Sequence, residues 1–277
     1  MKVAVTGANG YIGRHVVEAL LDMDCEVVAV DICGERVDKR AQYVQMSILD
    51  ADEQVYEKLG KPDAVVHLAW RDGFQHNSDA HVGDLSSHYI FVKNLLEGGL
   101  KNLSVMGSMH EIGYHEGAID ENTPANPLSM YGIAKNALRQ ASKLLAKQYD
   151  ASLKWLRGYY ILGDDRSNHS IFTKLLEAAE AGKKTFPFTS GKNQYDFLDI
   201  RELAVQIAAA AVQTEITDEI NCCSGKPLSL GERVEQFIRD NKLDITLEYG
   251  AFPDRAYDSP AIWGDASKIN RILEAGK

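Results

Sequence analysis

Short apolar runs alternate with amphipathic stretches through the first 160 residues of the chain. The runs, such as Lys2-Val-Ala-Val-Thr6, have the length and composition of buried parallel strands. The stretches between them place apolar residues three or four positions apart, as one face of a helix requires. We predict strands at 2–6, 26–31, 42–46, 63–69, 103–107 and 153–157, and helices at 12–23, 52–59, 86–98 and 130–149. This order predicts an α/β fold whose parallel sheet is covered by helices on both faces.

The pattern changes after Gly158, where the apolar blocks shorten and the polar connections lengthen. We predict helices at 171–181, 201–213 and 230–240, strands at 220–223 and 245–249, and a loop–strand region at 182–193. The helix at 201–213 is rich in alanine and is expected to lie in the core. Two polar segments interrupt the first part. The segment at 70–83 follows the carboxyl end of a strand, so we expect a mobile loop over the substrate there. The segment at 110–127 is irregular.

The first strand runs directly into Gly7-Ala-Asn-Gly10-Tyr-Ile-Gly13, and the second strand ends at Asp31. Gly7 permits a tight turn, Gly10 lets the backbone approach a diphosphate, and Gly13 allows the helix to pack closely on the strand. The helix N-terminus offers free N–H groups to phosphates, and Asp31 can accept hydrogen bonds from an adenosine ribose. This unit predicts a Rossmann-type, doubly wound parallel sheet that binds NAD(H). Arg36 and Arg40 follow closely enough to leave NADP(H) open.

The position of the dinucleotide-binding unit suggests a different role for each part of the chain. We predict that residues 1–160 form the dinucleotide-binding domain, with 195–222 returning to it. Residues 161–194 and 223–277 are then a smaller, interleaved C-terminal α/β lobe that binds the substrate.

Composition and charge narrow the partners. The net charge of −10 argues against nucleic acid or an anionic membrane surface. We see no apolar run of the ~20 residues that a bilayer span needs. Because the first strand begins at Lys2, we expect no signal peptide and a cytoplasmic protein. Cys25, Cys33, Cys222 and Cys223 form no CxxC pair and are expected to be free thiols, with no metal bound.

Tyr131 and Lys135 lie four positions apart in a predicted helix that Ser129 can cap, so their side chains share one face. A phenol has a pKa of about 10, and a neighbouring ammonium favours its ionised form. The pair could therefore act as a general acid and base near neutral pH. Ser108, at the end of the strand at 103–107, could hold the same substrate oxygen. Such a pair is common in helices, and the dinucleotide unit gives it its weight.

These motifs resemble those of the extended short-chain dehydrogenase/reductase family, which includes nucleotide-sugar epimerases, dehydratases and reductases. The resemblance covers nearly the whole chain. It rests on Thr6-Gly-x-x-Gly10-x-x-Gly13, Asp31, His67-Leu-Ala69, Ser108, Tyr131-x-x-x-Lys135, Tyr195-Asp-Phe-Leu-Asp199, Asn221-Cys-Cys-Ser-Gly225, and Arg255-Ala-Tyr-Asp258 leading into Trp263-Gly-Asp-Ala-Ser-Lys268.

The resemblance implies a nucleotide-sugar substrate and a homodimer formed through helices that include 131–149. It implies that Ser108, Tyr131 and Lys135 are catalytic. The implied cofactor-binding residues are Gly7, Asn9, Gly10, Tyr11, Ile12, Gly13, Asp31, Ile32, Ser47, Ile48, Leu68, Ala69, Trp70, Tyr131, Lys135 and Tyr160. The implied substrate-binding residues are Arg71, Ser108, Met109, His110, Tyr131 and Arg255, the last on the substrate diphosphate. The family often has Asp where Ser47 stands, near the adenine. It often has Asn where Tyr160 stands and Arg where Tyr195 stands, so the substrate-phosphate site is not the usual one.

The residues after Ser108 bear on the reaction. Family dehydratases carry Asp-Glu there, whereas this chain has Met109 and His110, and methionine cannot exchange a proton. We therefore expect NAD(P)H-dependent reduction of the C4 keto group of a nucleotide-linked hexose, for example dTDP-4-keto-6-deoxyglucose to dTDP-fucose. A nucleotide-sugar 4-epimerase with tightly bound NAD and a non-catalytic dinucleotide sensor are the alternatives.

Histidines are concentrated in one part of the chain. Six of the eight lie between His67 and His115. His110-Glu-x-x-x-His115 has one residue too many for the metal motif His-Glu-x-x-His. We therefore expect no metal, and place His110 near the sugar.

Overall fold

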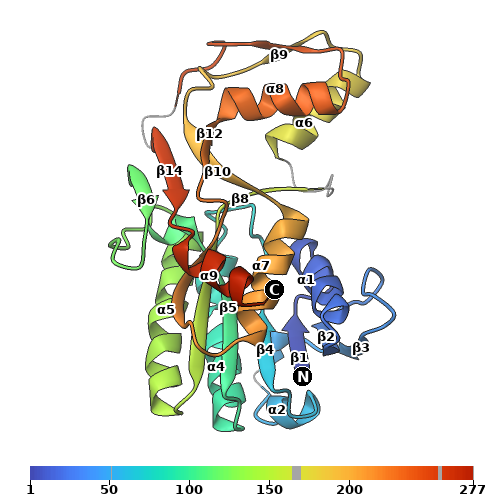
Figure 1. Cartoon of the computed structure of the whole chain (residues 1–277), viewed down its shortest axis with the longest axis vertical. Helices are drawn as coiled ribbons and strands as arrows, with labels where there is room; N and C mark the ends of the chain where they lie inside the picture. The colour runs from blue at the N-terminus through green and yellow to red at the C-terminus, as the bar shows by residue number, and fades with distance from the viewer. Residues whose placement is uncertain (51, 164–169, 255–257, 277) are drawn as a thin grey trace.

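The computed structural model describes residues 1–50, 52–163, 170–254 and 258–276. Its centre is a parallel sheet of seven strands in the order β11-β7-β5-β4-β1-β2-β3 (Figure 1). The strands are β1 (Lys2–Thr6), β2 (Glu26–Asp31), β3 (Gln42–Gln45), β4 (Ala64–His67), β5 (Asn102–Ser108), β7 (Ser152–Gly158) and β11 (Asp218–Cys222). The strand order changes direction at β1: β2 and β3 follow on one side of it, and β4, β5, β7 and β11 follow on the other. In open α/β sheets a ligand crevice forms at such a point, outside the carboxyl ends of the strands.

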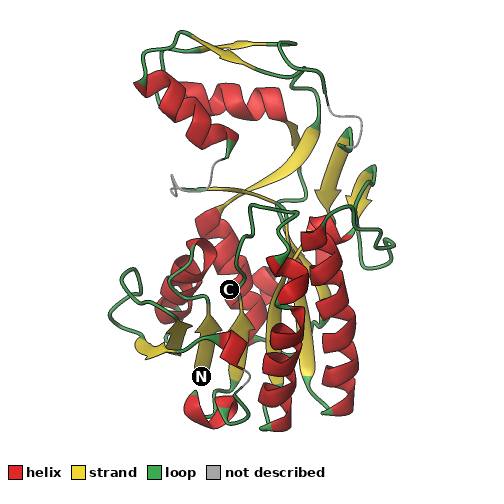
Figure 2. Cartoon of the chain, turned by 180° about the vertical axis from the view of Figure 1, so that it is seen from behind, coloured by secondary structure: helices red, strands yellow, loops and turns green. Residues whose placement is uncertain are grey.

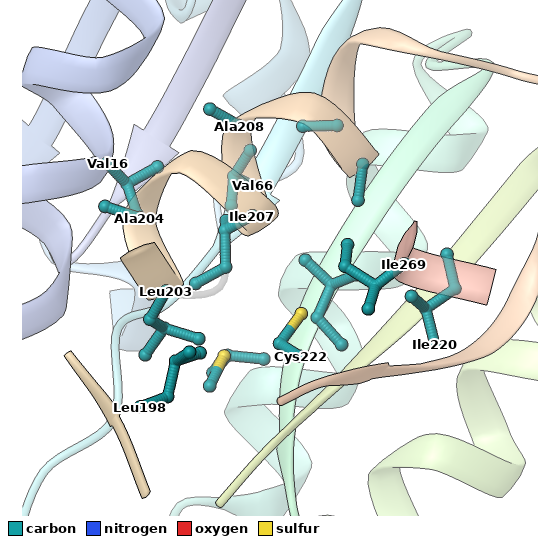
Figure 3. Close-up of a cluster of buried hydrophobic side chains, with 14 of the residues drawn as sticks. Val16, Val66, Leu198, Leu203, Ala204, Ile207, Ala208, Ile220, Cys222 and Ile269 are labelled. Carbon is teal, nitrogen blue, oxygen red and sulfur yellow. The ribbon is translucent and has the colours of Figure 1, made fainter. Parts of the chain in front are cut away.

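Helices cover both faces of this sheet. One face carries α1 (Tyr11–Asp22), α7 (Ile200–Val212) and α9 (Ser267–Ala275), and the other carries α2 (Val55–Lys58), α4 (Leu85–Glu97) and α5 (Met130–Gln148) (Figures 1 and 2). Alternate residues of β1 face the two cores, Val3 and Val5 toward α1 and Ala4 toward α4. Figure 3 shows side chains of α7 gathered with those of neighbouring strands and helices in the first core. The predicted core position of this alanine-rich helix is confirmed.

A second set of elements lies beyond the carboxyl end of the sheet (Figure 1). A five-stranded sheet contains β6 (Gly117–Ile119), β8 (Tyr160–Leu162), β10 (Gln194–Asp199), β12 (Pro227–Ser229) and β14 (Ala261–Gly264). Above it, α6 (Ile171–Glu180) and α8 (Leu230–Asp240) pack with the strand pair β9 (Thr185–Pro187) and β13 (Thr246–Glu248). Their small core contains Leu175, Ala178, Phe188, Val234 and Ile245.

The predicted α/β fold with its parallel sheet is confirmed, and most predicted elements are present within a few residues. Helix α2 is shorter than the predicted 52–59. The segment 70–83 contains the one-turn helix α3 (Ala80–Gly83), and 110–127 contains β6 after the 3₁₀ turn η2 (Met109–Glu111). Strands β8, β10, β12 and β14 and helix α9 were not predicted. In the described parts of the chain, no helix is long and apolar enough to cross a membrane.

Candidate active site

The glycine loop between β1 and α1 closes tightly. Gly7 has a φ of +69°, in the left-handed region, and a Cβ there would lie 2.7 Å from the backbone nitrogen of Ala69. A Cβ on Gly13 would lie 1.9 Å from the carbonyl oxygen of Gly7. The N-cap of α1 is Gly10, which makes no side-chain capping bond, so the first N–H groups of this helix stay available to an anion. The loop therefore fits the diphosphate of a dinucleotide.

Asp31 ends β2 beside this loop. Its carboxylate accepts hydrogen bonds from the backbone N–H groups of Asn9 (3.0 Å) and Ile32 (2.7 Å). The Asn9 side chain in turn donates to Cys33 Sγ (3.1 Å) and accepts from the backbone N–H of Arg36 (2.7 Å). These bonds join the glycine loop to the segment after β2 and hold the Asp31 carboxylate where a ribose hydroxyl could reach it.

Other residues predicted to bind the cofactor lie around this loop. Ser47 and Ile48 follow β3, whose last residue pairs with Asp31. Leu68 and Ala69 follow β4, and both backbone N–H groups donate to the Thr6 hydroxyl at 3.2 Å. Tyr11 lies against the turn after β8, since a Cβ on Gly163 would be 2.2 Å from its hydroxyl.

Ser108 ends β5 and caps the turn η2. Its hydroxyl accepts a hydrogen bond from the backbone N–H of His110 (3.3 Å), and its own N–H donates to Glu111 Oε1 (2.7 Å). Glu111 is fully buried and also accepts hydrogen bonds from Trp155 Nε1 at 2.9 Å. Sequence reasoning missed this role, although Ser-x-x-Glu is the pattern of a capping box.

Tyr131 and Lys135 lie in the first turns of α5, which begins after the predicted N-cap Ser129. Burial and the Glu111 carboxylate raise the pKa of Tyr131, while a hydrogen bond with the Ser108 side chain lowers it. Burial lowers the pKa of Lys135 to about 7, and Glu111 opposes that shift.

The structure differs here from the sequence prediction that Lys135 keeps Tyr131 acidic. Lys135 Nζ donates to the Met106 carbonyl (2.7 Å) and lies 5.8 Å from the centre of the Tyr131 ring. Burial therefore dominates, and the phenol is neutral at pH 7. Three groups that could take part in proton transfer therefore meet at the carboxyl edge of the sheet: a neutral phenol, the Ser108 hydroxyl near it, and a lysine near its own titration midpoint.

Five of the six clustered histidines surround these groups, whereas the sequence predicted only His110 near the site. The His76 ring stacks on Tyr131 at 5.4 Å and lies 4.2 Å from His110. His81 lies 5.2 Å from the Tyr131 ring, while the His88 ring lies 4.3 Å from Trp70 and 5.2 Å from His67. Burial lowers the pKa of His110 to about 4, so this imidazole is neutral at physiological pH. Among the described residues no group of three or more His, Cys, Asp or Glu could hold a metal ion.

The structure does not bring every predicted substrate-binding or cofactor-binding residue to this site. Arg71 is 61% exposed and pairs with Asp84 at the start of α4. Met109 is buried in the core beside α7. Tyr160 stacks on Tyr195 at 4.3 Å, in β8 and β10. Arg255 lies outside the described residues. The roles given to these residues stay predictions.

Comparisons with known proteins decide the family. The profile of the NAD dependent epimerase/dehydratase family matches residues 3–223. A dTDP-6-deoxy-L-talose 4-dehydrogenase (NAD(+)) from Aggregatibacter actinomycetemcomitans is 44% identical over 269 residues, covering 95% of this chain and 99% of that protein. The chain belongs to the NAD-dependent epimerase/dehydratase family. The sequence prediction of an NAD-dependent enzyme of this kind is thereby confirmed.

Solved structures of this family share the fold. The UDP-glucose 4-epimerase of Thermotoga maritima is 22% identical, with a TM-score of 0.81 over 98% of this chain and 92% of that one. The UDP-glucuronic acid 4-epimerase of Bacillus cereus, solved with UDP-glucuronic acid and NAD, is 23% identical with a TM-score of 0.81, covering 99% and 93%. At these identities the likeness establishes the architecture alone.

Proposed function

We propose that this protein is an NAD(H)-dependent oxidoreductase that interconverts a hydroxyl and a keto group at C4 of a dTDP-linked 6-deoxyhexose. The observation that carries the proposal is the meeting of Ser108, at the end of β5, with Tyr131 and Lys135, in the first turns of α5, at the carboxyl edge of the sheet. The 44% identity to a dTDP-6-deoxy-L-talose 4-dehydrogenase over nearly the full length of both chains supports the choice of sugar.

Each residue has a defined task in this reaction. When bound, NAD(H) accepts or supplies the hydride at C4. In the reductive direction Tyr131 donates its proton to the oxygen at C4, and Ser108 hydrogen-bonds that oxygen. The raised pKa of Tyr131 suits this direction, because the phenol is protonated at pH 7. Lys135 supplies positive charge beside the phenolate that proton donation leaves.

Cofactor binding is assigned to the glycine loop. The N–H groups at the start of α1 would hold the diphosphate, and Asp31 would accept hydrogen bonds from the adenosine ribose. Residues 1–160, with 195–222, would form this domain, and 161–194 with 223–277 would hold the nucleotide sugar.

The relative's substrate makes dTDP-6-deoxy-L-talose and its 4-keto form the first pair to test. The dTDP-4-keto-6-deoxyglucose expected from the sequence is the second. Absorbance at 340 nm should rise when the protein is mixed with NAD⁺ and dTDP-6-deoxy-L-talose, and fall with NADH and a 4-keto sugar. NMR of the product should place the change at C4. No change of absorbance with any of these sugars would contradict the proposal.

A 4-epimerase is the second candidate, because other relatives have that activity, such as the UDP-glucose 4-epimerase of Lactobacillus helveticus at 23% identity over 99% of this chain and 91% of that one. An epimerase returns the hydride to the same sugar and consumes no added cofactor. It would release bound NAD on denaturation and interconvert UDP- or dTDP-hexoses without change at 340 nm.

A homodimer is proposed through α4 and α5. Ile133 and Leu144 on α5 and Tyr89 on α4 are exposed apolar side chains, and a hollow between the two helices is lined largely by apolar residues. Sedimentation should give the mass of two chains for the wild type and of one for Leu144→Glu. Gln148→Glu, which adds the same charge at a polar exposed position, is the control.

A further inference from the structure

The indole of Trp70 lies beside the candidate active site and contacts several of its side chains. Trp70 follows the end of β4, and the ammonium of Lys135 lies 3.7 Å from the centre of its ring. The His88 ring stacks on the same indole at 4.3 Å, with 21° between the planes. Trp70 Nε1 donates to His81 Nδ1 at 3.0 Å. Three side chains from three helices therefore contact one indole.

The hydrogen bonds around Trp70 fix the protonation of His81. An indole N–H can only donate, so His81 Nδ1 must be unprotonated. Its proton is then on Nε2, which donates to the Gln75 carbonyl at 3.0 Å. His81 is thus a neutral imidazole bonded on both sides, and it anchors the edge of the indole to the backbone of the segment at 70–83.

A second chain of bonds fixes His88. The Thr6 hydroxyl accepts from two backbone N–H groups, so its proton goes to His67 Nδ1 at 2.8 Å. His67 Nε2 must then donate to His88 Nδ1 at 3.0 Å. Burial lowers the pKa of His67 well below its usual value and that of His88 to about 3, so both are neutral. This chain runs from the edge of the glycine loop to the ring stacked on Trp70.

The buried ammonium of Lys135 has few charged neighbours to stabilise it. It makes no ion pair with any described residue, and its hydrogen bond goes to the Met106 carbonyl. The titratable groups that face it are Tyr131 on α5, Glu111 on η2, His67 on β4 and His88 on α4. Of these, only Glu111 carries a negative charge at neutral pH, and it lies beyond ion-pair contact.

We propose that Trp70 is a positioning residue for Lys135: its indole, clamped by His81 and His88, holds the ammonium beside Tyr131 and keeps it charged. A cation over an indole is the strongest of the cation–π pairs, and it gains strength where water is excluded, as here. This proposal rests on the proposed function, in which Lys135 serves Tyr131. It also gives His67, His81 and His88 a task that needs no metal.

The test measures Lys135 directly. Protein carrying ¹³C at lysine Cε is titrated by NMR without substrate, and the Lys135 signal is assigned by its loss in Lys135→Met. The titration midpoint of Lys135 should fall by about one pH unit in Trp70→Leu. Trp70→Met, which fills more of the space without a π face, should show the same fall. Trp70→Phe, which keeps an aromatic face, should recover at least half of it. Wild-type midpoints in both the Leu and the Met variants would overturn the proposal.

Kinetics separate this proposal from the proposed function. In the reductive direction, the loss of kcat at high pH should begin about one pH unit lower in Trp70→Leu than in the wild type, with KM for the sugar unchanged. If Tyr131→Phe and Lys135→Met keep wild-type kcat, the proposed function fails. The NMR midpoints would still decide whether Trp70 holds the charge on Lys135.

Discussion

Two buried charges lie on either side of Ser108, and their surroundings are opposite. Glu111 is fully buried and accepts hydrogen bonds from the Ser108 N–H and Trp155 Nε1. Two guanidinium groups, of Arg139 and Arg157, lie 3.5 Å and 3.6 Å from it. The carboxylate is thus surrounded by donors and cations.

Lys135 is only 2% exposed, yet its partners are one carbonyl, an indole ring and neutral histidines. Burying a charge costs free energy unless the charge is paired. A buried lysine without a charged partner therefore has a lowered pKa. This difference in surroundings indicates two different roles. The charge of Glu111 is balanced by donors and cations, as in a structural ion pair. Lys135 can titrate near neutral pH, as a group that assists proton transfer should.

The largest expected effect tests whether the Lys135 side of this comparison is the reacting side. Tyr131→Phe removes the proton donor beside Lys135 and keeps the ring, so kcat should fall by about 10²–10⁴-fold while the fold is retained. Steady-state kinetics and circular dichroism check this. Tyr114→Phe, at an exposed tyrosine of the neighbouring loop, should keep wild-type kcat. A Tyr131→Phe enzyme with full activity would mean that the phenol is not the acid.

Substitution of Glu111 should lower the stability of the protein. Glu111→Gln keeps the volume but takes the buried anion away from Arg157, while Arg139 keeps its ion pair with the buried Glu219, so the free energy of unfolding should fall by about 3–5 kcal/mol. Urea denaturation measures this change. Glu116→Gln, at an exposed carboxylate of the loop after η2, should change it by less than about 0.5 kcal/mol. Equal effects of the two substitutions would show that Glu111 is not a structural anion.

Removal of the Lys135 charge should instead raise the free energy of unfolding. Lys135→Met replaces an unpaired buried ammonium by an apolar side chain of similar length, so at pH 7 and below the variant should be more stable by about 1–4 kcal/mol, although inactive. Gln140→Met, on an exposed position of the same helix, is the matched control and should leave stability unchanged.

The pH dependence of that difference follows from the lowered pKa of Lys135, about 7 in the folded protein. Below pH 7 the lysine is protonated in both the folded and the unfolded chain, and the full cost of burying the charge is present. As the pH rises above 7, the folded protein loses the proton while the unfolded chain keeps it up to about pH 10.5, so the wild type gains stability. The advantage of Lys135→Met should therefore shrink between pH 7 and 10, and a gap that widens would contradict the lowered pKa.

Local signals made one end of the site predictable from the sequence. The tight turn at Gly7, the close packing at Gly13 and the cap at Ser129 each depend on a few neighbouring residues, and the structure contains all three. Spacing of four along a helix was likewise enough to place Tyr131 and Lys135 near each other. It was not enough to show which atom Lys135 contacts, because its hydrogen bond joins α5 to Met106 in β5, 29 positions earlier in the chain.

The rest of the site depends on contacts that spacing does not encode. Trp70 meets Lys135 only because β4 and α5 converge at one edge of the fold, 65 positions apart in the chain. The concentration of histidines was visible in the sequence, but their hydrogen bonds with Thr6 and Trp70 were not. The strands β8, β10 and β14 escaped prediction because they take their partners from distant segments, and β8 and β14 have only three and four residues.

The smallest effect concerns the rim of the Lys135 side, where His110 contacts His76 at 4.2 Å and Tyr131 at 6.0 Å. With its pKa near 4, His110 is neutral across the working range and contributes packing and hydrogen bonds but no proton. His110→Gln should therefore lower kcat/KM by about 2–10-fold, the worth of an aromatic contact, and leave the pH midpoints of kcat in place. His115→Gln is the control, because the His115 ring hydrogen-bonds to the Ala118 carbonyl and, among the described residues, makes no ring contact with Tyr131. A loss of 10²-fold or more together with a missing pH limb would make His110 a proton carrier, and the charge on Lys135 would then no longer be the feature that sets the pH range of the reaction.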